Sequence, residues 1–336
     1  MKKFFILLTL LLLICGGAAA YMWRQFYGDA VVEDRLIYLS GNSLGGDVVD
    51  SLILPNVENH LAFNFYRKRL NLDNTIKPGR YELRRGMSVI DVVRMFKLGL
   101  QSPVVVTFNN ARTAETLAGK IAPQIEADSV SILQAITSID LAKEMGLELE
   151  EMLAIFIPNS YEMWWTTTPE ALIERMKLEY DRFWTPQREA ARKELGLSRV
   201  EVSTLASIVY EESAKEDEMA RIGGVYVNRL KRGMLLQADP TVKFAVGDFT
   251  LQRILYKHLE CDSPYNTYKY AGLPPGPIAV PSISALDGVL FYERHNYLYF
   301  CARPEMDGYH NFAATYSQHL ANARKYSAEL NRLGIR

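Results

Sequence analysis

The clearest hydrophobic pattern in the chain is an uninterrupted apolar run near its N-terminus. The run covers residues 4–22, contains no charged residue and follows Lys2 and Lys3. As a helix it is long enough to cross the hydrocarbon core, and Trp23 follows where an interfacial aromatic residue is expected. We therefore expect residues 1–23 to be a single-pass signal anchor in the cytoplasmic membrane. The two lysines place the N-terminus inside and the rest of the chain on the extracytoplasmic (periplasmic) side.

A cleaved signal peptide is the alternative, because residues 18–20 are three alanines that follow a positively charged start. Cys15 is not expected to carry a lipid, since Ile14 occupies the preceding position, where that processing signal needs a small residue. Both the anchor and the signal peptide would export residues 24–336.

Residues 24–101 have the mixed periodicity of a small α/β unit next to the membrane. A strand is expected over residues 31–39, and apolar positions at helical spacing follow over residues 47–70. From about residue 75 to 100 the chain predicts a turn, a short strand and a helix with Ser88 as its N-cap. This succession resembles a LysM-like glycan-binding subdomain. A structural spacer between the membrane and the remaining chain fits the same pattern.

Residues 102–197 predict an intermediate α/β and helical region that serves as scaffold. A strand is expected at 104–108, with helices at 113–121 and 129–145. A longer helical segment over 169–195 should be interrupted near Pro186, because proline cannot donate an interior helical hydrogen bond.

A helix that begins near residue 198 carries the most informative polar residue. Ser198 and Glu201 have the spacing of a capping box, which predicts a helix that runs to about residue 213. One face of this helix has apolar residues and then a carboxylate, in the order Val202, Leu205, Val209 and Glu212.

Glu212 is therefore expected to point into the interior or into a cleft. Burial disfavours the charged carboxylate and raises its pKa, as a general acid at neutral pH requires. Glu211 lies about 100° around the helix from Glu212 and is expected to point to water. The alternative is that Glu212 only ends the apolar face at the helix terminus.

Polar and aromatic residues that could hold a sugar follow this helix. A second helix is expected over 216–230, an irregular polar loop over 235–241, a Pro- and Gly-rich loop up to residue 278, and a closing helix over 313–333. Amides and hydroxyls suit sugar hydroxyls and acetamides, and aromatic rings pack against sugar faces. The alternative is ordinary turn chemistry, since Asp-Pro and Pro-Gly are turn formers. The candidate substrate-binding residues are Asn228, Gln237, Asp239, Thr241, Tyr265, Asn266, Thr267, Tyr268 and Pro274.

Composition and charge narrow the class of function. Hydrophobic residues make up 49% and charged residues 23% of the 336 residues, as in folded globular domains. The net charge of −1 provides no basic field, so no nucleic acid partner is expected. The five histidines include no HExxH pattern and the chain has no GxSxG pattern, so neither a metal nor another cofactor is expected. Cys261 and Cys301 could form one disulfide but no disulfide framework.

The order and spacing of these segments resemble the endolytic peptidoglycan transglycosylase family (MltG or YceG-like). The residues that carry the resemblance lie at 205–213, 228–230, 236–241, 265–268 and 272–278. Segments 77–99 and 156–161 are also similar to that family, so the likeness covers most of the chain. The expected fold is α+β, with the anchor helix, the LysM-like subdomain and a catalytic YceG-like domain over residues 198–336.

The resemblance implies endolytic, non-hydrolytic cleavage between N-acetylmuramic acid and N-acetylglucosamine in peptidoglycan glycan strands, leaving a 1,6-anhydro ring. The catalytic glutamate of the family falls on Glu212, and Ser213 meets the family pattern of a following hydroxyl residue. His310 lies in a similar neighbourhood near the family's end and lines or braces the site, with bracing favoured. A role in terminating nascent strands, with peptidoglycan synthases as partners, is also implied.

Two other functions use the same features. A non-catalytic envelope scaffold that binds peptidoglycan would have the same anchor and polar loops, but it would not need Glu212. A muramidase that hydrolyses the bond would need a second carboxylate, for which Asp239 is the candidate.

Overall fold

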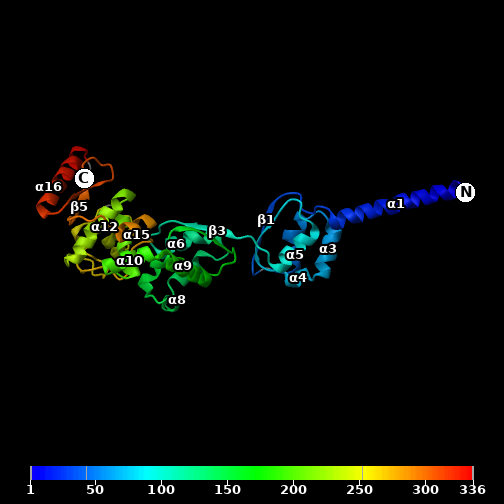
Figure 1. Cartoon of the computed structure of the whole chain (residues 1–336), viewed down its shortest axis with the longest axis horizontal. Helices are drawn as coiled ribbons and strands as arrows, with labels where there is room; N and C mark the ends of the chain where they lie inside the picture. The colour runs from blue at the N-terminus through cyan, green and yellow to red at the C-terminus, as the bar shows by residue number, and fades with distance from the viewer. Residues whose placement is uncertain (1, 43, 252, 335–336) are drawn as a thin grey trace. The chain divides into compact units, whose positions relative to one another are not determined.

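The structure is a computed structural model that describes residues 2–42, 44–251 and 253–334. Helix α1 (Lys2–Tyr27) opens the chain as one long helix (Figure 1). Its segment Phe4–Tyr27 is long and apolar enough to cross a membrane, and its most apolar 18 residues, with a mean hydropathy of 2.4, are not buried in the protein. The helix predicted from the apolar run is confirmed, and its length and composition are consistent with a membrane anchor.

Two compact units make up the chain. The first contains residues 1–106 together with the short segments 123–127 and 161–168, and the second contains the remaining residues. This grouping is coarser than the expected four-part division, whose boundaries stay a prediction. Helices and strands occur in both units, which confirms the α+β class.

The first unit is built on a two-stranded antiparallel sheet of β1 (Arg35–Leu39) and β2 (Gly79–Leu83). Helices α3 (His60–Arg69) and α5 (Val89–Leu98) supply the core, in which Phe63, Tyr81 and Phe96 are fully buried. The other short elements are α2 (Gly46–Val48), the π-helical turn Val49–Ile53, the 3₁₀ turn Leu54–Asn56 and α4 (Leu72–Thr75).

Local signals decide where these elements begin and end. Ser88 caps α5 as predicted, through a capping box with Asp91, and Gly99 ends the helix in the left-handed conformation. The helical segment expected over 47–70 is divided, because Pro55 interrupts it and α3 begins only at His60. The LysM-like character of this unit stays a prediction.

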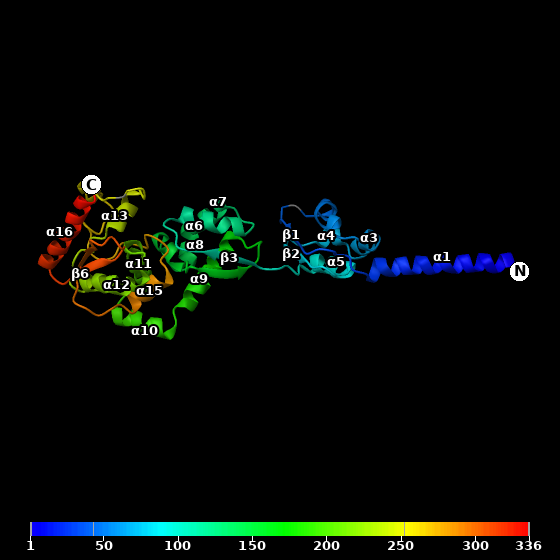
Figure 2. The same cartoon turned by 90° about the horizontal axis from the view of Figure 1, so that it is seen from above.

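Strand β3 (Val104–Phe108) pairs with β4 (Asn159–Met163), and each of these two strands contains residues assigned to both units. The surrounding elements can be followed in Figure 2. They are α6 (Ala114–Ile121), a 3₁₀ turn (Ala122–Gln124), α7 (Ser129–Ile136), α8 (Ile139–Glu144), a 3₁₀ helix (Leu149–Ile155), α9 (Pro169–Phe183) and α10 (Pro186–Leu195). The interruption predicted at Pro186 is confirmed, since α10 begins there as a separate helix.

Three packed helices form the centre of the second unit: α11 (Arg199–Glu212), α12 (Glu216–Lys231) and α15 (Ile283–Leu290). The approach of α12 to α15 requires glycine, because a Cβ on Gly223 would lie 2.8 Å from the Gly288 carbonyl oxygen. Residues 202–209 of α11 are all buried, so this helix is enclosed by its neighbours.

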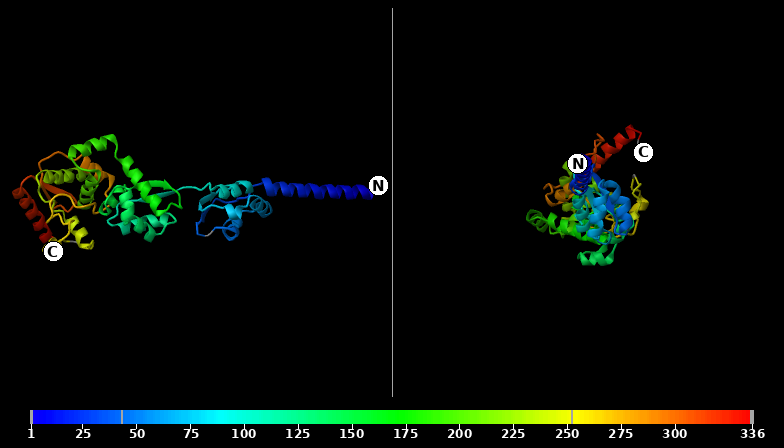
Figure 3. Two further views of the ribbon diagram at one scale, coloured as in Figure 1. Left: turned by 90° about the horizontal axis from the view of Figure 1, so that it is seen from below. Right: turned by 90° about the vertical axis from the view of Figure 1, so that its right-hand side faces the viewer.

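The C-terminal part adds the elements that surround one end of α11. They are α13 (Asp239–Val246), α14 (Tyr256–Leu259), the antiparallel hairpin of β5 (Tyr299–Ala302) and β6 (His310–Ala313), and the closing helix α16 (Tyr316–Arg332). Helix α16 packs against the hairpin, as Figure 3 shows in red and orange.

One expectation about this part is wrong. The loop predicted over 235–241 is a loop only as far as Ala238, because Pro240 lies in the first turn of α13. Proline is compatible with a first turn, where its missing N–H has no helical partner, so Asp-Pro begins a helix here. Cys261 and Cys301, for which a disulfide was left open, are free thiols in the part of the chain that the structure describes.

Candidate active site

Glu212 is the last residue of α11, at the end of the face that the sequence predicted. Ser198 caps the start of the helix in a capping box with Glu201, and this sets the helical register that follows. Val202, Leu205 and Val209 are fully buried, whereas the half-buried Glu212 lines an open pocket. The predicted placement of Glu212 toward a cleft is confirmed.

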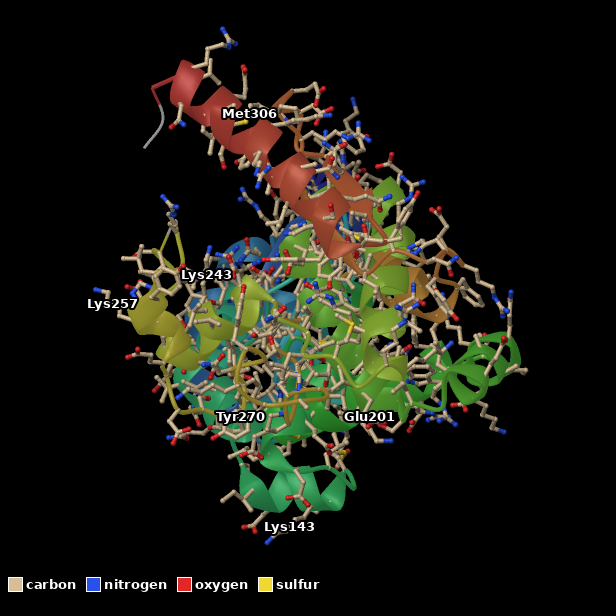
Figure 4. The ribbon with its side chains drawn as sticks, turned by 90° about the vertical axis from the view of Figure 1, so that its left-hand side faces the viewer. Lys143, Glu201, Lys243, Lys257, Tyr270 and Met306 are labelled. Atoms are coloured by element: carbon tan, nitrogen blue, oxygen red, sulfur yellow. The ribbon has the colours of Figure 1, made fainter. Side chains whose placement is uncertain are left out.

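The environment of Glu212 brings the pKa of its carboxyl close to neutral pH. Burial is the largest cause and raises the pKa from 4.5 to about 7. Tyr226 on α12 donates a hydrogen bond of 2.6 Å to Oε1 of Glu212, which lowers the pKa. The negative charge of Asp239 raises it, while Arg229 and Lys243 lower it, with Lys243 labelled on α13 in Figure 4.

Glu211 does not point freely to water, contrary to the expectation from helix geometry. Its side chain is 11% exposed, and the carboxylate forms an ion pair of 2.8 Å with Arg112. The two adjacent glutamates are therefore separated by environment: Glu211 is paired with a cation, and Glu212 faces the pocket.

The pocket has a volume of about 360 Å³ and is built from segments far apart in the sequence. Figure 4 shows the hairpin (orange) beside α16 (red), with Met306 labelled in the turn between the strands. The lining residues are Glu212, Tyr226, Arg229, Leu236, Gln237, Asp239, Tyr268, Tyr299, Phe300, Cys301, His310, Tyr316 and His319.

Arg229 holds one wall of the pocket together. Its guanidinium is almost fully buried and donates to the carbonyl oxygens of Leu298 at 2.6 Å and Leu236 at 2.7 Å. It also lies over the ring of Tyr299, 5.2 Å from the ring centroid. This one side chain joins α12 to the loop before α13 and to the start of the hairpin.

Asp239 and Tyr268 form a polar pair at the pocket. The Tyr268 hydroxyl donates to Oδ1 of Asp239 over 2.6 Å, and burial together with this carboxylate raises the pKa of Tyr268. Asp239 is exposed, in contrast to Glu212. Gln237 precedes this pair with a φ of 51°, a left-handed conformation that is uncommon for a residue with a side chain.

An aromatic wall faces this polar side. The rings of Tyr299 and His319 are stacked with centroids 5.3 Å apart, and Tyr316 lies 5.8 Å from Tyr299. Tyr316 and His319 are three residues apart on α16 and therefore share a helix face. None of these three residues was among the predicted sugar-binding residues, and the i, i+3 spacing of Tyr316 and His319 in the closing helix is the sequence signal that could have found two of them.

The structure brings only part of the predicted set into the pocket. Glu212, Gln237, Asp239 and Tyr268 line it together, whereas six other candidates do not: Asn228, Thr241, Tyr265, Asn266, Thr267 and Pro274. The role of each residue in binding stays a prediction.

Hydrogen bonds within the protein occupy most of those six side chains. The Asn228 amide donates to the carbonyl oxygens of His295 at 2.8 Å and Tyr297 at 3.0 Å. Thr241 and Thr267 are buried and bond to each other at 2.8 Å. The buried Asn266 amide donates to two carbonyl oxygens of the preceding segment.

The remaining two candidates have apolar surroundings. The Tyr265 ring packs 4.6 Å from Phe244 in a separate apolar hollow that also contains Pro277, and burial raises the Tyr265 pKa to about 12. Pro274 is buried. Over the described ranges, no group of three or more His, Cys, Asp or Glu side chains is arranged to hold a metal ion.

His310 both lines the pocket and braces the hairpin. Its Nδ1 lies 2.9 Å from Oε2 of Glu218, a carboxylate on α12 that is only 2% exposed. Its backbone N–H donates to the other oxygen of Glu218 at 3.1 Å. Both of the roles considered for His310 are therefore seen in its contacts.

Comparison with known proteins finds relatives of this chain among bacterial proteins that are named endolytic murein transglycosylase. It is 27% identical over 312 residues to a protein of Bacillus subtilis named endolytic murein transglycosylase, covering 87% of this chain and 84% of that protein. A Streptococcus pneumoniae protein of the same name is 29% identical over 281 residues, covering 73% of this chain. The chain spans half the length of that streptococcal relative.

A solved structure supports the same relationship. The crystal structure of a yceG-like protein from Listeria monocytogenes matches with a TM-score of 0.57 and 26% sequence identity. The match covers 86% of this chain and 98% of the Listeria chain. Residues 41–325 of the chain match the YceG-like family. This protein therefore belongs to the YceG-like family.

Proposed function

We propose that this protein is an endolytic murein transglycosylase that uses Glu212 as its catalytic acid and base. The single observation that carries the proposal is the placement of Glu212 in a pocket with a pKa of about 7. A carboxylic acid with this pKa can donate a proton at neutral pH and can accept one in a later step. The names of the bacterial relatives supply the substrate class, peptidoglycan.

The reaction can be written with Glu212 alone. The protonated carboxyl donates its proton to the glycosidic oxygen, and the bond from that oxygen to C1 of N-acetylmuramic acid breaks with its electron pair on the leaving oxygen. The C6 hydroxyl oxygen of the same sugar then attacks C1, and its proton passes to the Glu212 carboxylate. The products are a 1,6-anhydro end and a free 4-hydroxyl, and Glu212 is protonated again without consumption of water.

The difference between the two pocket carboxylates favours this scheme over hydrolysis. Glu212 is half-buried and has the raised pKa, whereas Asp239 is exposed and accepts a hydrogen bond from Tyr268. We assign Asp239 to electrostatic tuning of Glu212 and to binding of sugar hydroxyls. In a muramidase Asp239 would instead be indispensable, as the base for water or as the nucleophile.

The N-terminal helix sets where the reaction takes place. We infer that α1 is retained as an anchor in the cytoplasmic membrane and holds the catalytic unit on its outer side, where peptidoglycan lies. Cleavage within strands by an anchored enzyme would limit the length of nascent strands close to the synthases that extend them.

The proposal is tested by mass spectrometry of muropeptides released from purified peptidoglycan by the full-length protein in detergent. Three proteins are compared: wild type, Glu212→Gln and Glu211→Gln. The third is a matched control, because Glu211 is the adjacent carboxylate but is paired with Arg112. We expect 1,6-anhydro products from wild type and Glu211→Gln and none from Glu212→Gln.

Other results would identify the rival functions. Products with free reducing ends that disappear in Asp239→Asn would indicate a two-carboxylate hydrolase. Binding of glycan strands without any release, unchanged in Glu212→Gln, would indicate a scaffold.

A further inference from the structure

A buried pair of Glu218 and His310 lies at the pocket and takes no part in the reaction as written above. Glu218 belongs to the first turn of α12, and its 2% exposure requires partners for the carboxylate. Both partners come from one residue: the backbone N–H and the Nδ1 of His310 contact the two oxygens of Glu218, at 3.1 and 2.9 Å. The carbonyl of His310 is held in turn by Nε of Arg303 at 3.2 Å.

This arrangement orients the imidazole. With Nδ1 directed at an acceptor-only carboxylate, Nδ1 carries the proton, and Nε2 is the nitrogen left for another partner. The ring stands edge to face against Phe300, with centroids 5.3 Å apart, which restricts its rotation. Among the residues that the structure describes, Nε2 has no hydrogen-bond partner, and His310 lines the pocket that contains Glu212.

We propose that His310 binds the glycan directly through Nε2, which accepts a hydrogen bond from a hydroxyl or acetamido N–H of an N-acetylated sugar. Glu218 is its positioning residue, because the buried carboxylate selects the tautomer and fixes the ring plane. This inference rests on the proposed function only for the identity of the ligand, a peptidoglycan strand.

The residue before His310, Tyr309, is an example of a purely structural contact between the hairpin and α12. Tyr309, the neighbour of His310, also joins the hairpin to α12, through hydrogen bonds of its hydroxyl to Asp217 at 3.2 and 3.4 Å. Tyr309 does not line the pocket. The pair of Tyr309 and Asp217 therefore provides a control for bracing without contact to a ligand.

The decisive variant is His310→Asn. The asparagine amide can still donate to Glu218 from a position near the former Nδ1, but it has no group near Nε2. We expect this variant to keep the melting temperature of the wild type and to bind purified glycan strands about tenfold more weakly, the effect of one lost hydrogen bond. The control Tyr309→Phe should lower the melting temperature without weakening binding per folded molecule.

Binding is measured in full-length protein that also carries Glu212→Gln, so that no strand is cleaved. The result is then independent of the reaction: a wild-type enzyme that releases no anhydro product would overturn the proposed function, while the comparison of affinities still tests His310. Equal affinity of the His310→Asn protein and its parent would overturn the inference and leave bracing as the role of the pair.

The positioning role of Glu218 has its own readout. In Glu218→Gln the amide oxygen must accept from the backbone N–H of His310, which turns the amide NH2 toward Nδ1 as a donor. Nδ1 must then be the acceptor, so the imidazole should change to the tautomer protonated at Nε2. Nitrogen-15 shifts of the His310 ring should report this change, together with a loss of glycan affinity similar to that of His310→Asn. Unchanged ring shifts with unchanged affinity would rule out the positioning role.

Discussion

The hydroxyl of Tyr226 donates a hydrogen bond of 2.6 Å to Oε1 of Glu212, and this bond links α12 to the proposed catalytic carboxyl. The bond stabilises the charged form of Glu212 and partly opposes the effect of burial on its pKa. The reverse also holds, because burial and the nearby carboxylate raise the pKa of Tyr226 well above its usual value, so Tyr226 remains a donor.

Removal of this hydrogen bond should move the pH dependence of the reaction upward. In Tyr226→Phe the Glu212 carboxylate loses its donor, so the pKa rises further above about 7. Activity, which needs protonated Glu212, should then persist to a higher pH than in the wild type. A pH profile of kcat/KM on glycan strands measures this. An alkaline limb that stays in place or moves to lower pH would contradict the role of Tyr226.

Asp239→Asn should shift the alkaline limb of the pH profile of kcat/KM to lower pH. The negative charge of Asp239 raises the pKa of Glu212, and its loss makes ionisation easier. Activity should therefore begin to fall at a lower pH, while part of it remains at the optimum. Complete loss of activity at every pH would instead assign Asp239 a chemical role. The matched control is Asp262→Asn, a carboxylate that bonds Tyr270 outside the pocket.

Glu212 should make the folded protein less stable as the pH rises. Its pKa is about 7 in the folded state and 4.5 in the reference state, so between these values the folded state binds more protons and stability falls with increasing pH. The full shift corresponds to about 3 kcal/mol at most. Glu212→Gln should therefore raise the melting temperature at pH 8 much more than at pH 5. An equal effect at both pH values would contradict the raised pKa.

Gln237 combines an unfavourable backbone conformation with a place in the pocket. A glycine adopts a φ of 51° without a steric penalty, so Gln237→Gly should stabilise the fold by up to about 1 kcal/mol. The same change removes a side chain that lines the pocket, so KM for glycan strands should rise. Thermal melting and steady-state kinetics test both parts. A gain in stability with unchanged KM would show that the side chain does not meet the substrate.

The aromatic wall should bind sugar through the face of Tyr316, which is 60% exposed. Tyr316→Ala removes this face, whereas Tyr316→Phe keeps it and removes only the hydroxyl. We expect KM to rise by a factor of about five in the alanine variant, for roughly 1 kcal/mol of lost ring contact, and little change in the phenylalanine variant. Similar effects of the two variants would indicate that the hydroxyl, and not the ring face, contacts the strand.

Much of the secondary structure was predictable because its signals are local. The capping residues Ser88 and Ser198, the stop at Gly99 and the break at Pro186 act through neighbours within one helical turn. The error at Asp239 has the same origin: Asp-Pro can form a turn or open a helix, and the neighbours alone do not decide between them.

By itself, the sequence determined the long apolar helix, the helix with Glu212 at the end of its apolar face, and the resemblance that pointed to this residue. Tertiary structure decided the rest of the pocket. Tyr299, His310 and Tyr316 follow Glu212 by about ninety to one hundred residues and meet it only because the hairpin packs against α12 and α16 packs against the hairpin. Tertiary structure also decided which polar side chains face the pocket and which, like Thr241 and Thr267, bond to each other in the interior. The physical reason is that hydrogen-bond partners and burial depend on contacts between distant segments, which a pattern of neighbouring residues does not specify.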